Sequence, residues 1–280
     1  MTTRIARRGT RNARYAGRQA ARSRYLAILA RTGLAARGVM YILIGWIALE
    51  IAFGHSSKQA DSSGALRLVG SSPVGKVALW LLVVGFVGLA LWRLTEAIYG
   101  AAGPDGHKAS KRVAALGRTV LYGFLAFVVL KYAIGAGAPK SSNSQSKDLT
   151  ATAMAHPGGR ILVILVGLAL AIAGVILAYQ AWRKNFLKHL QLASAGLTAR
   201  RVVERLGQIG GIARGAVFAG VGIFLFVAGV KANPGQAKGI DATLRSFAST
   251  PLGPWLLALV AAGLVVFGLY SWCEARWRKV

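Results

Sequence analysis

An all-α polytopic membrane protein is the fold class that this sequence predicts, with six transmembrane helices arranged as three two-helix hairpins with pseudo-threefold symmetry. Three observations lead to it: an apolar composition, six long apolar segments, and a pattern that occurs three times. Apolar residues make up 55% of the 280 residues and the mean hydropathy is +0.50, more than a soluble domain needs for one core. The net charge of +27 must then lie mostly outside the bilayer, where anionic phospholipids are the expected counter-charge.

The six apolar segments are each long enough to cross the hydrocarbon core, which takes about 20 residues of helix. A helix is expected because lipid offers no hydrogen-bond partner for an exposed backbone amide or carbonyl. The first segment is expected to be retained rather than cleaved as a signal peptide, since no small-residue cleavage site follows it before Glu50. The expected spans are 34–53, 76–98, 117–137, 160–182, 212–232 and 254–273.

The distribution of Lys and Arg sets the expected orientation, because the cytoplasmic flanks of membrane spans carry the excess of positive charge. Of the 35 basic residues, 25 lie in the N-terminal stretch through Arg37, around the connections after the second and fourth spans, and in the C-terminal tail. The three remaining loops share the other 10. Both termini are therefore predicted to be cytoplasmic.

A repeat with a period of about 80 to 95 residues runs through the chain. Each copy has an arginine at the start of its first span with an aromatic residue four positions later, a proline before its second span, and Glu or Gln 23 residues after that proline. Proline suits the first position of a helix, and Ser72 or Thr250 can cap the freed amides. The marks are Arg37, Arg118 and Arg214 with Tyr41, Tyr122 and Phe218; Pro73, Pro157 and Pro251; and Glu96, Gln180 and Glu274.

The repeats divide the chain into units that share one orientation, because each unit crosses the membrane twice. Such copies relate by an axis along the membrane normal, so a ring of three hairpins is the expected packing. Segments 65–69 and 242–247 also resemble each other, which predicts a small helix on the outer surface that is degraded in the second copy. The expected units are a basic tail over 1–30, repeat 1 over 31–100, repeat 2 over 112–185 and repeat 3 over 205–277.

The Arg-Gly-x-x-Tyr start at Arg37 to Tyr41 and the Trp-Arg-Leu-Thr-Glu end at Trp92 to Glu96, together with the triplication, resemble a bacterial family known as domain of unknown function 1206. The resemblance covers about residues 30–277. It implies three repeats of a two-helix unit in a bacterial cytoplasmic (plasma) membrane, and it implies no activity. The second repeat departs from the family pattern, with Thr119 in place of glycine and Gln180 in place of glutamate.

Two candidate polar sites follow from the repeat register. Arg37, Arg118 and Arg214 are expected to form a cytoplasmic ring with Glu96, Gln180 and Glu274 through Arg-to-Glu pairs, since the repeats place both sets at one membrane depth. Such pairs either fix the geometry of the hairpins or form a gate or ligand site. Glu50 and Lys131 each lie 13 residues after a repeat arginine, and they are candidates for an intramembrane pair.

The N-terminal tail carries its arginines at helical spacing, which allows an electrostatic contact with anionic headgroups. A disordered tail is the alternative. Nucleic acid is not expected as a partner, because no aromatic interleaving or recognised fold accompanies the charge. No metal or cofactor is expected either, since the four histidines are scattered and no nucleotide motif or catalytic set is present. The tail arginines are Arg4, Arg7, Arg8, Arg11, Arg14, Arg18 and Arg22, and the histidines are His55, His107, His156 and His189.

The most direct interpretation of these features is a structural or interaction component of the membrane, not an enzyme. Its basic cytoplasmic surface would engage anionic phospholipids or a membrane or cytoplasmic protein partner. The alternative is a transporter or channel for a small solute, expected to be an anion, with the repeat axis as its pathway and the Arg/Glu ring as its gate.

Overall fold

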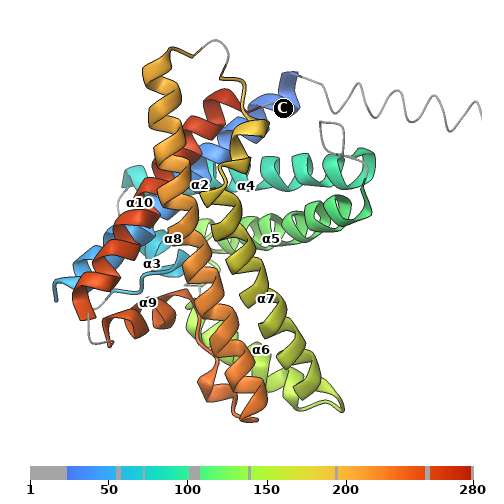
Figure 1. Cartoon of the computed structure of the whole chain (residues 1–280). Coiled ribbons are helices and arrows are strands. Elements are labelled where there is room, and N and C mark those ends of the chain that lie inside the picture. Colours follow the sequence, from blue (N-terminus) through green and yellow to red (C-terminus); the bar gives the residue numbers. More distant parts are fainter. Residues whose placement is uncertain are drawn as a thin grey trace, which may run out of the picture.

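The computed structural model describes residues 24–54, 58–71, 73–100, 108–137, 140–192, 195–249 and 253–278, and within them the chain forms nine α-helices. Six of these helices are long and apolar enough to cross a membrane, as the sequence predicts. They are α2 (Arg24–Ala52), α4 (Pro73–Tyr99), α5 (Ala109–Ala133), α7 (Gly159–Trp182), α8 (Leu197–Val230) and α10 (Gly253–Trp277). Figure 1 shows them as long rods that cross near the centre of the molecule.

The long helices differ from the expected spans mainly at their basic ends. Helix α8 begins at Leu197, whereas its span is expected from 212, and α5 begins at Ala109 instead of 117. The added turns carry Arg200, Arg201 and Arg205 in α8. Such residues are good helix formers but are not apolar, so a hydropathy criterion stops before the helix does.

Short helices lie between the two spans of each repeat. The expected outer helices are present as α3 (Ser62–Gly70) and α9 (Ile240–Ala248), and the second copy holds a longer helix, α6 (Ser142–Met154). The Asp61 side chain caps α3 by accepting from the backbone N–H groups of Ser63 and Gly64. Two 3₁₀ turns, η1 (Asn185–His189) and η2 (Pro234–Gln236), complete the described elements.

Proline marks the starts of the second spans unevenly. Helix α4 begins at Pro73, as predicted, but Pro157 lies two residues before α7 begins at Gly159. Pro251 and the expected capping residues Ser72 and Thr250 lie outside the described residues, as do the seven tail arginines, His55 and His107.

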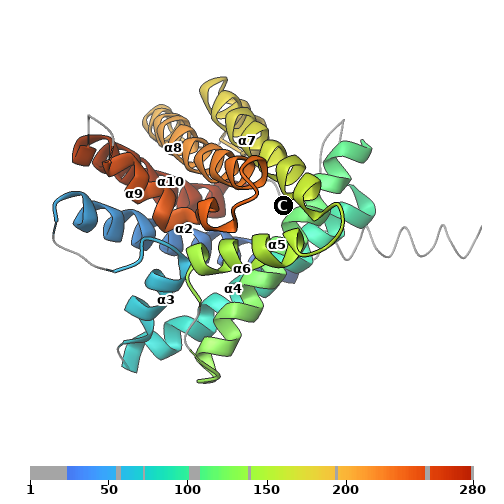
Figure 2. The same ribbon diagram turned by 90° about the horizontal axis from the view of Figure 1, so that it is seen from below.

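The long helices pack as three pairs, and each pair joins the second span of one repeat to the first span of the next. These pairs are α4 with α5, α7 with α8, and α10 with α2 (Figures 1 and 2). Arginine side chains tie two of the pairs by capping carbonyl groups at the partner's C-terminus. Arg112 of α5 donates to Ala97 O and Ile98 O, and Arg160 of α7 donates to Gly229 O and Val230 O.

Within the repeats, packing is unequal. Helix α2 packs against α4 in repeat 1 and α10 against α8 in repeat 3, but α5 and α7 of repeat 2 share no packed surface. Helix α7 turns Gly167 and Gly174 toward α8, where they allow the two backbones to approach closely. The ring expected from the repeats is therefore open within repeat 2.

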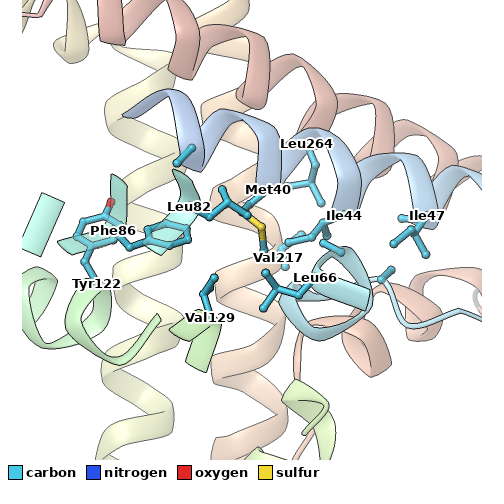
Figure 3. Packing of buried hydrophobic residues seen from close by; sticks show 14 of the residues in the cluster. Met40, Ile44, Ile47, Leu66, Leu82, Phe86, Tyr122, Val129, Val217 and Leu264 are labelled. Atoms are coloured by element: carbon cyan, nitrogen blue, oxygen red, sulfur yellow. The ribbon is translucent and has the colours of Figure 1, made fainter. Parts of the chain in front are cut away.

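The main core lies where α2, α4 and α10 meet, with side chains of α3, α5 and α8 completing it. Figure 3 shows Met40 and Ile44 of α2 beside Val217 and Leu264 in this core, with Ile47 farther along the same helix. This core holds the basic ends of repeats 1 and 3 together, and that is where the polar site lies.

Candidate functional site

Arg37 occupies the centre of the polar site, on the face of α2 that packs against α10. Its guanidinium group donates to the Ser271 hydroxyl from Nε at 3.2 Å and from Nη2 at 3.1 Å, and it forms an ion pair with Glu274. Both charged side chains are less than a tenth exposed. The expected Arg-to-Glu contact therefore exists between repeat 1 and repeat 3, with Ser271 as an added acceptor.

Glu274 has a second arginine partner. Arg278, four residues later and one position past the end of α10, pairs with the same carboxylate and lies with its Cζ 4.8 Å from the centre of the Trp92 ring. Two guanidinium groups thus share one carboxylate. This leaves an excess of positive charge around the pair.

Glu96 pairs with its own helix instead of with a first-span arginine. Arg93, three residues earlier in α4, forms the ion pair and lies over the Trp92 ring with Cζ 4.1 Å from its centre. The Arg93 side chain is 5% exposed, and its Nε is buried with no hydrogen-bond partner among the described residues. Glu96 therefore neutralises Arg93 and leaves the repeat arginines of repeats 2 and 3 without a carboxylate.

Arg214 is surrounded by aromatic rings. Its Cζ lies 5.0 Å from the centre of the Phe267 ring, 5.3 Å from Phe218 and 5.9 Å from Tyr41. The Nε atom is buried without a hydrogen-bond partner, and none of the ion pairs among the described residues includes this arginine. Aromatic faces stabilise a cation only in part, so a bound anion would stabilise the Arg214 guanidinium group further.

The repeat 2 members of the expected ring lie at its open side. Arg118 of α5 is exposed, yet it is within electrostatic range of Arg93 and Arg214, and Gln180 of α7 is exposed as well. Tyr122, one turn after Arg118, is buried, and its hydroxyl lies among Arg37, Arg93 and Arg214. The structure thus brings Arg118 to the site, and Gln180 makes no contact with it.

We use the name arginine cluster for these five guanidinium groups with the two carboxylates beside them. Burial, followed by the positive charges of Arg278 of the cluster and of Lys111, lowers the pKa of His189 outside the spans. Five positive and two negative groups, of which only Arg118 is exposed, have the composition of an anion-binding site. Its members are Arg37, Arg93, Arg118, Arg214, Arg278, Glu96 and Glu274.

The site predicted from the sequence does not include Arg93 and Arg278. In the sequence they contribute only to the count of basic residues that sets the expected orientation. The signal was present, because each lies three or four residues from a repeat glutamate on the same helix. The predicted site also lacks Ser271, a buried hydroxyl whose role depends on α2 lying against α10. No spacing within the sequence indicates that contact.

Glu50 and Lys131 are not joined in the structure. Glu50 accepts a hydrogen bond from Trp46 Nε1 at 2.9 Å and pairs with Lys58 at 3.6 Å. Lys131 lies 5.8 Å from the centre of the Phe127 ring, and no ion pair among the described residues includes it. Equal register in two repeats does not imply contact, because α2 and α5 belong to different helix pairs.

A second polar centre, also missed by the sequence, joins all three repeats at the other end of the bundle. Asp61 is fully buried and accepts from Ser63 and Gly64 of its own repeat and from the backbone N–H and hydroxyl of Ser142 in repeat 2, at 2.7 and 2.8 Å. The Ser142 hydroxyl accepts from the Ile240 N–H of repeat 3 at 3.1 Å. Both carboxylate oxygens of Asp61 and the hydroxyl group of Ser142 have hydrogen-bond partners within the protein, so this polar centre is structural.

Two hollows lie away from the arginine cluster. One of about 320 Å³ is lined by residues at the junction of α6 and α7, and one of about 370 Å³ lies along α3. No member of the cluster lines either.

The matches to known proteins divide the chain into the same three repeats. The model of the family named Domain of Unknown Function (DUF1206) matches residues 32–100, 113–184 and 209–278. A Bacillus subtilis (strain 168) protein described as uncharacterised is 27% identical over 243 residues, which cover 86% of this chain and 87% of that protein. No solved structure matches. Because the three family matches together span most of the chain, one for each two-helix unit, the chain belongs to the DUF1206 family.

Proposed function

We propose that this protein is a non-enzymatic interaction component of the bacterial cytoplasmic membrane, which binds an anionic group through its arginine cluster. The observation that carries the proposal is the charge of the cluster. Five guanidinium groups converge with two carboxylates, and Arg214 has rings around it instead of an acceptor. A cation in such surroundings is stabilised by a bound anion, because little water is present to solvate it.

The orientation supports a cytoplasmic site. The cluster lies at the ends of the helices where the basic residues collect, and these ends are cytoplasmic by the positive-inside rule. The expected partners are therefore anionic phospholipids of the inner leaflet, or an acidic segment of a membrane or cytoplasmic protein. Nucleic acid is not proposed, because the cluster is recessed among the helices and offers no extended surface.

The proposal is tested by thermal unfolding of the detergent-solubilised protein in pyrophosphate and in chloride at equal ionic strength. A ligand that binds only the folded state raises the unfolding midpoint, so pyrophosphate is expected to stabilise the wild type more than chloride does. The Arg214→Gln variant should lose that difference. Arg205→Gln removes the same charge from an exposed position of the same helix and should keep it. Equal shifts in all three proteins would contradict the proposal.

Anion transport is a second candidate, favoured by one observation. The Arg37–Glu274 pair joins repeat 1 to repeat 3 at the cytoplasmic end, where a gate on the repeat axis would lie. Cysteine substitution at Arg118 with Cys273 replaced, probed by a membrane-impermeant thiol reagent from outside, tests this candidate. Labelling of the cysteine from outside would favour a pathway through the bundle. Complete protection of the cysteine would contradict transport and favour the interaction component.

A further inference from the structure

We infer that the arginine cluster holds the phosphate of an anionic phospholipid, which enters from the inner leaflet through the opening between α5 and α7. The inference rests on the proposed function, chooses the lipid from the two partners expected there, and adds the group that is bound and its route. It follows from three features of repeat 2: the separation of its helices, the position of Arg118, and the apolar side chains on both sides.

The helices α5 and α7 of repeat 2 are not among the packed helix pairs of the described residues. The corresponding helices of repeats 1 and 3 pack against each other, and α2 and α10 close the ring between them. Both helices of repeat 2 instead lie against neighbours in other repeats. A ligand can therefore reach the cluster laterally from the bilayer.

Arg118 points to this opening. At 100° per residue it lies on the same side of α5 as Tyr122, which is buried against α4. A residue on that side is expected to be covered, yet Arg118 is exposed. Because α7 does not pack against α5, Arg118 is accessible while it interacts electrostatically with Arg93 and Arg214 of the cluster.

The groups around the opening fit a phosphate. Arg118 lies within electrostatic range of Arg93 and Arg214, and the Nε atoms of both of these arginines are buried with no hydrogen-bond partner in the part of the chain that the structure describes. Guanidinium groups bind phosphate oxygens through charge-assisted hydrogen bonds. A phosphodiester bears one negative charge, which would neutralise part of the excess positive charge of the cluster. Four of the five arginines of the cluster lie within the membrane-spanning helices, so a headgroup of the adjacent leaflet is closer to them than a solute in bulk water.

Apolar side chains extend away from the opening along both helices. Leu121 of α5, three residues after Arg118, and Ile172 and Ile176 of α7 are exposed and would lie against acyl chains. A lipid held by its phosphate can thus keep its chains in the bilayer. A free anion would make no use of this surface.

Native mass spectrometry of the full chain tests the inference, with phosphatidylglycerol, phosphatidylcholine and inorganic phosphate as separate probes. We expect phosphatidylglycerol to be retained over phosphatidylcholine, and Arg118→Gln and Arg214→Gln each to lower its affinity about tenfold, the effect of one lost charge-assisted hydrogen bond. Arg205→Gln should change the affinity by about twofold or less. Arg118 is exposed, so its substitution reports on binding even where Arg214→Gln impairs folding.

Each other outcome overturns the inference in a distinct way. Binding of inorganic phosphate that both substitutions abolish, without retention of phosphatidylglycerol, would leave the proposed function standing and refute the lipid. Retention of neither probe would refute both. An equal loss in Arg205→Gln and Arg118→Gln would show that lipid is held by general surface charge and not by the cluster.

Discussion

The charged residues of this protein are of two kinds, which differ in whether their polar atoms have partners within the protein. Asp61 has every oxygen engaged with backbone or hydroxyl donors, whereas Arg214 has aromatic faces and no acceptor among the described residues. The first arrangement contributes to stability without a ligand. The second is stable only to the extent that rings and distant carboxylates offset the cost of desolvation, and for this reason we assign it to binding.

Glu274 is the carboxylate on which the core of the cluster depends. Its replacement by Gln leaves Arg37 and Arg278 buried without their shared counter-charge, a change that costs about 3 kcal/mol of unfolding free energy. We expect Glu274→Gln to lower the thermal unfolding midpoint in detergent. Glu204→Gln, which removes the partner of the partly exposed Lys184, serves as the control and should change the midpoint little. Equal midpoints for the two variants would contradict a buried pair.

Asp61 should be equally sensitive at the other end of the bundle. In Asp61→Asn an amide N–H₂ group would face the donors of Ser142, so those donors lose their acceptor at a cost of about 3 kcal/mol. The expected result is a lower unfolding midpoint and faster proteolysis near α6. The exposed pair of Lys140 with Asp148 provides the control, and Asp148→Asn should leave both measurements unchanged.

At the level of helices, pairing depends on small residues that allow backbones to approach. A Cβ atom on Gly174 of α7 would lie 2.3 Å from the backbone nitrogen of Ala219 in α8, whereas one on Gly117 of α5 would meet no atom within 4 Å. The α7–α8 pair therefore requires glycine at 174. Residue 117 is free to change because α5 turns that side away from its neighbours.

Alanine at these two positions separates packing from helix propensity. Gly174→Ala should separate α7 from α8 and lower stability by about 2 kcal/mol, the cost of overpacking. Gly117→Ala should be neutral or raise stability by up to about 1 kcal/mol, because alanine is the better helix former. Thermal unfolding in one detergent compares the two variants directly. A Gly174→Ala protein as stable as Gly117→Ala would show that the close approach is not required.

For the whole molecule, the charge distribution predicts an orientation that a fusion experiment measures. Green fluorescent protein fused after Val280 should fluoresce, because this end carries the excess of basic residues and is expected in the cytoplasm. Alkaline phosphatase fused at the same place should be inactive, since it acquires its disulfides only outside. The same enzyme fused after Lys140, between the two spans of repeat 2, should be active. The reverse pattern would show that the protein has the opposite orientation, with the arginine cluster at the outer face of the membrane.

The extent of the sequence prediction follows from the range of the interactions concerned. Six spans, three repeats, and the short helices α3 and α9 are predictable because hydropathy and register are local properties that each segment carries by itself. The arginines and glutamates of the cluster are also visible in the sequence. What local patterns cannot supply is the choice of a neighbour in another repeat: Arg37 pairs with Glu274, and Asp61 accepts from Ser142.

Hydropathy and the repeat register predict a thrice-repeated helical hairpin protein with most of its positive charge at one end, since burial of backbone amides in lipid leaves few other solutions. It is the packing of the helices that separates α5 from α7, leaves Arg118 exposed, and places Arg214 among rings with no carboxylate partner among the described residues. The physical reason is that helices in lipid associate through the shape of their faces and not through hydrophobicity. Three similar repeats can therefore pack unequally, and the inequality forms the site.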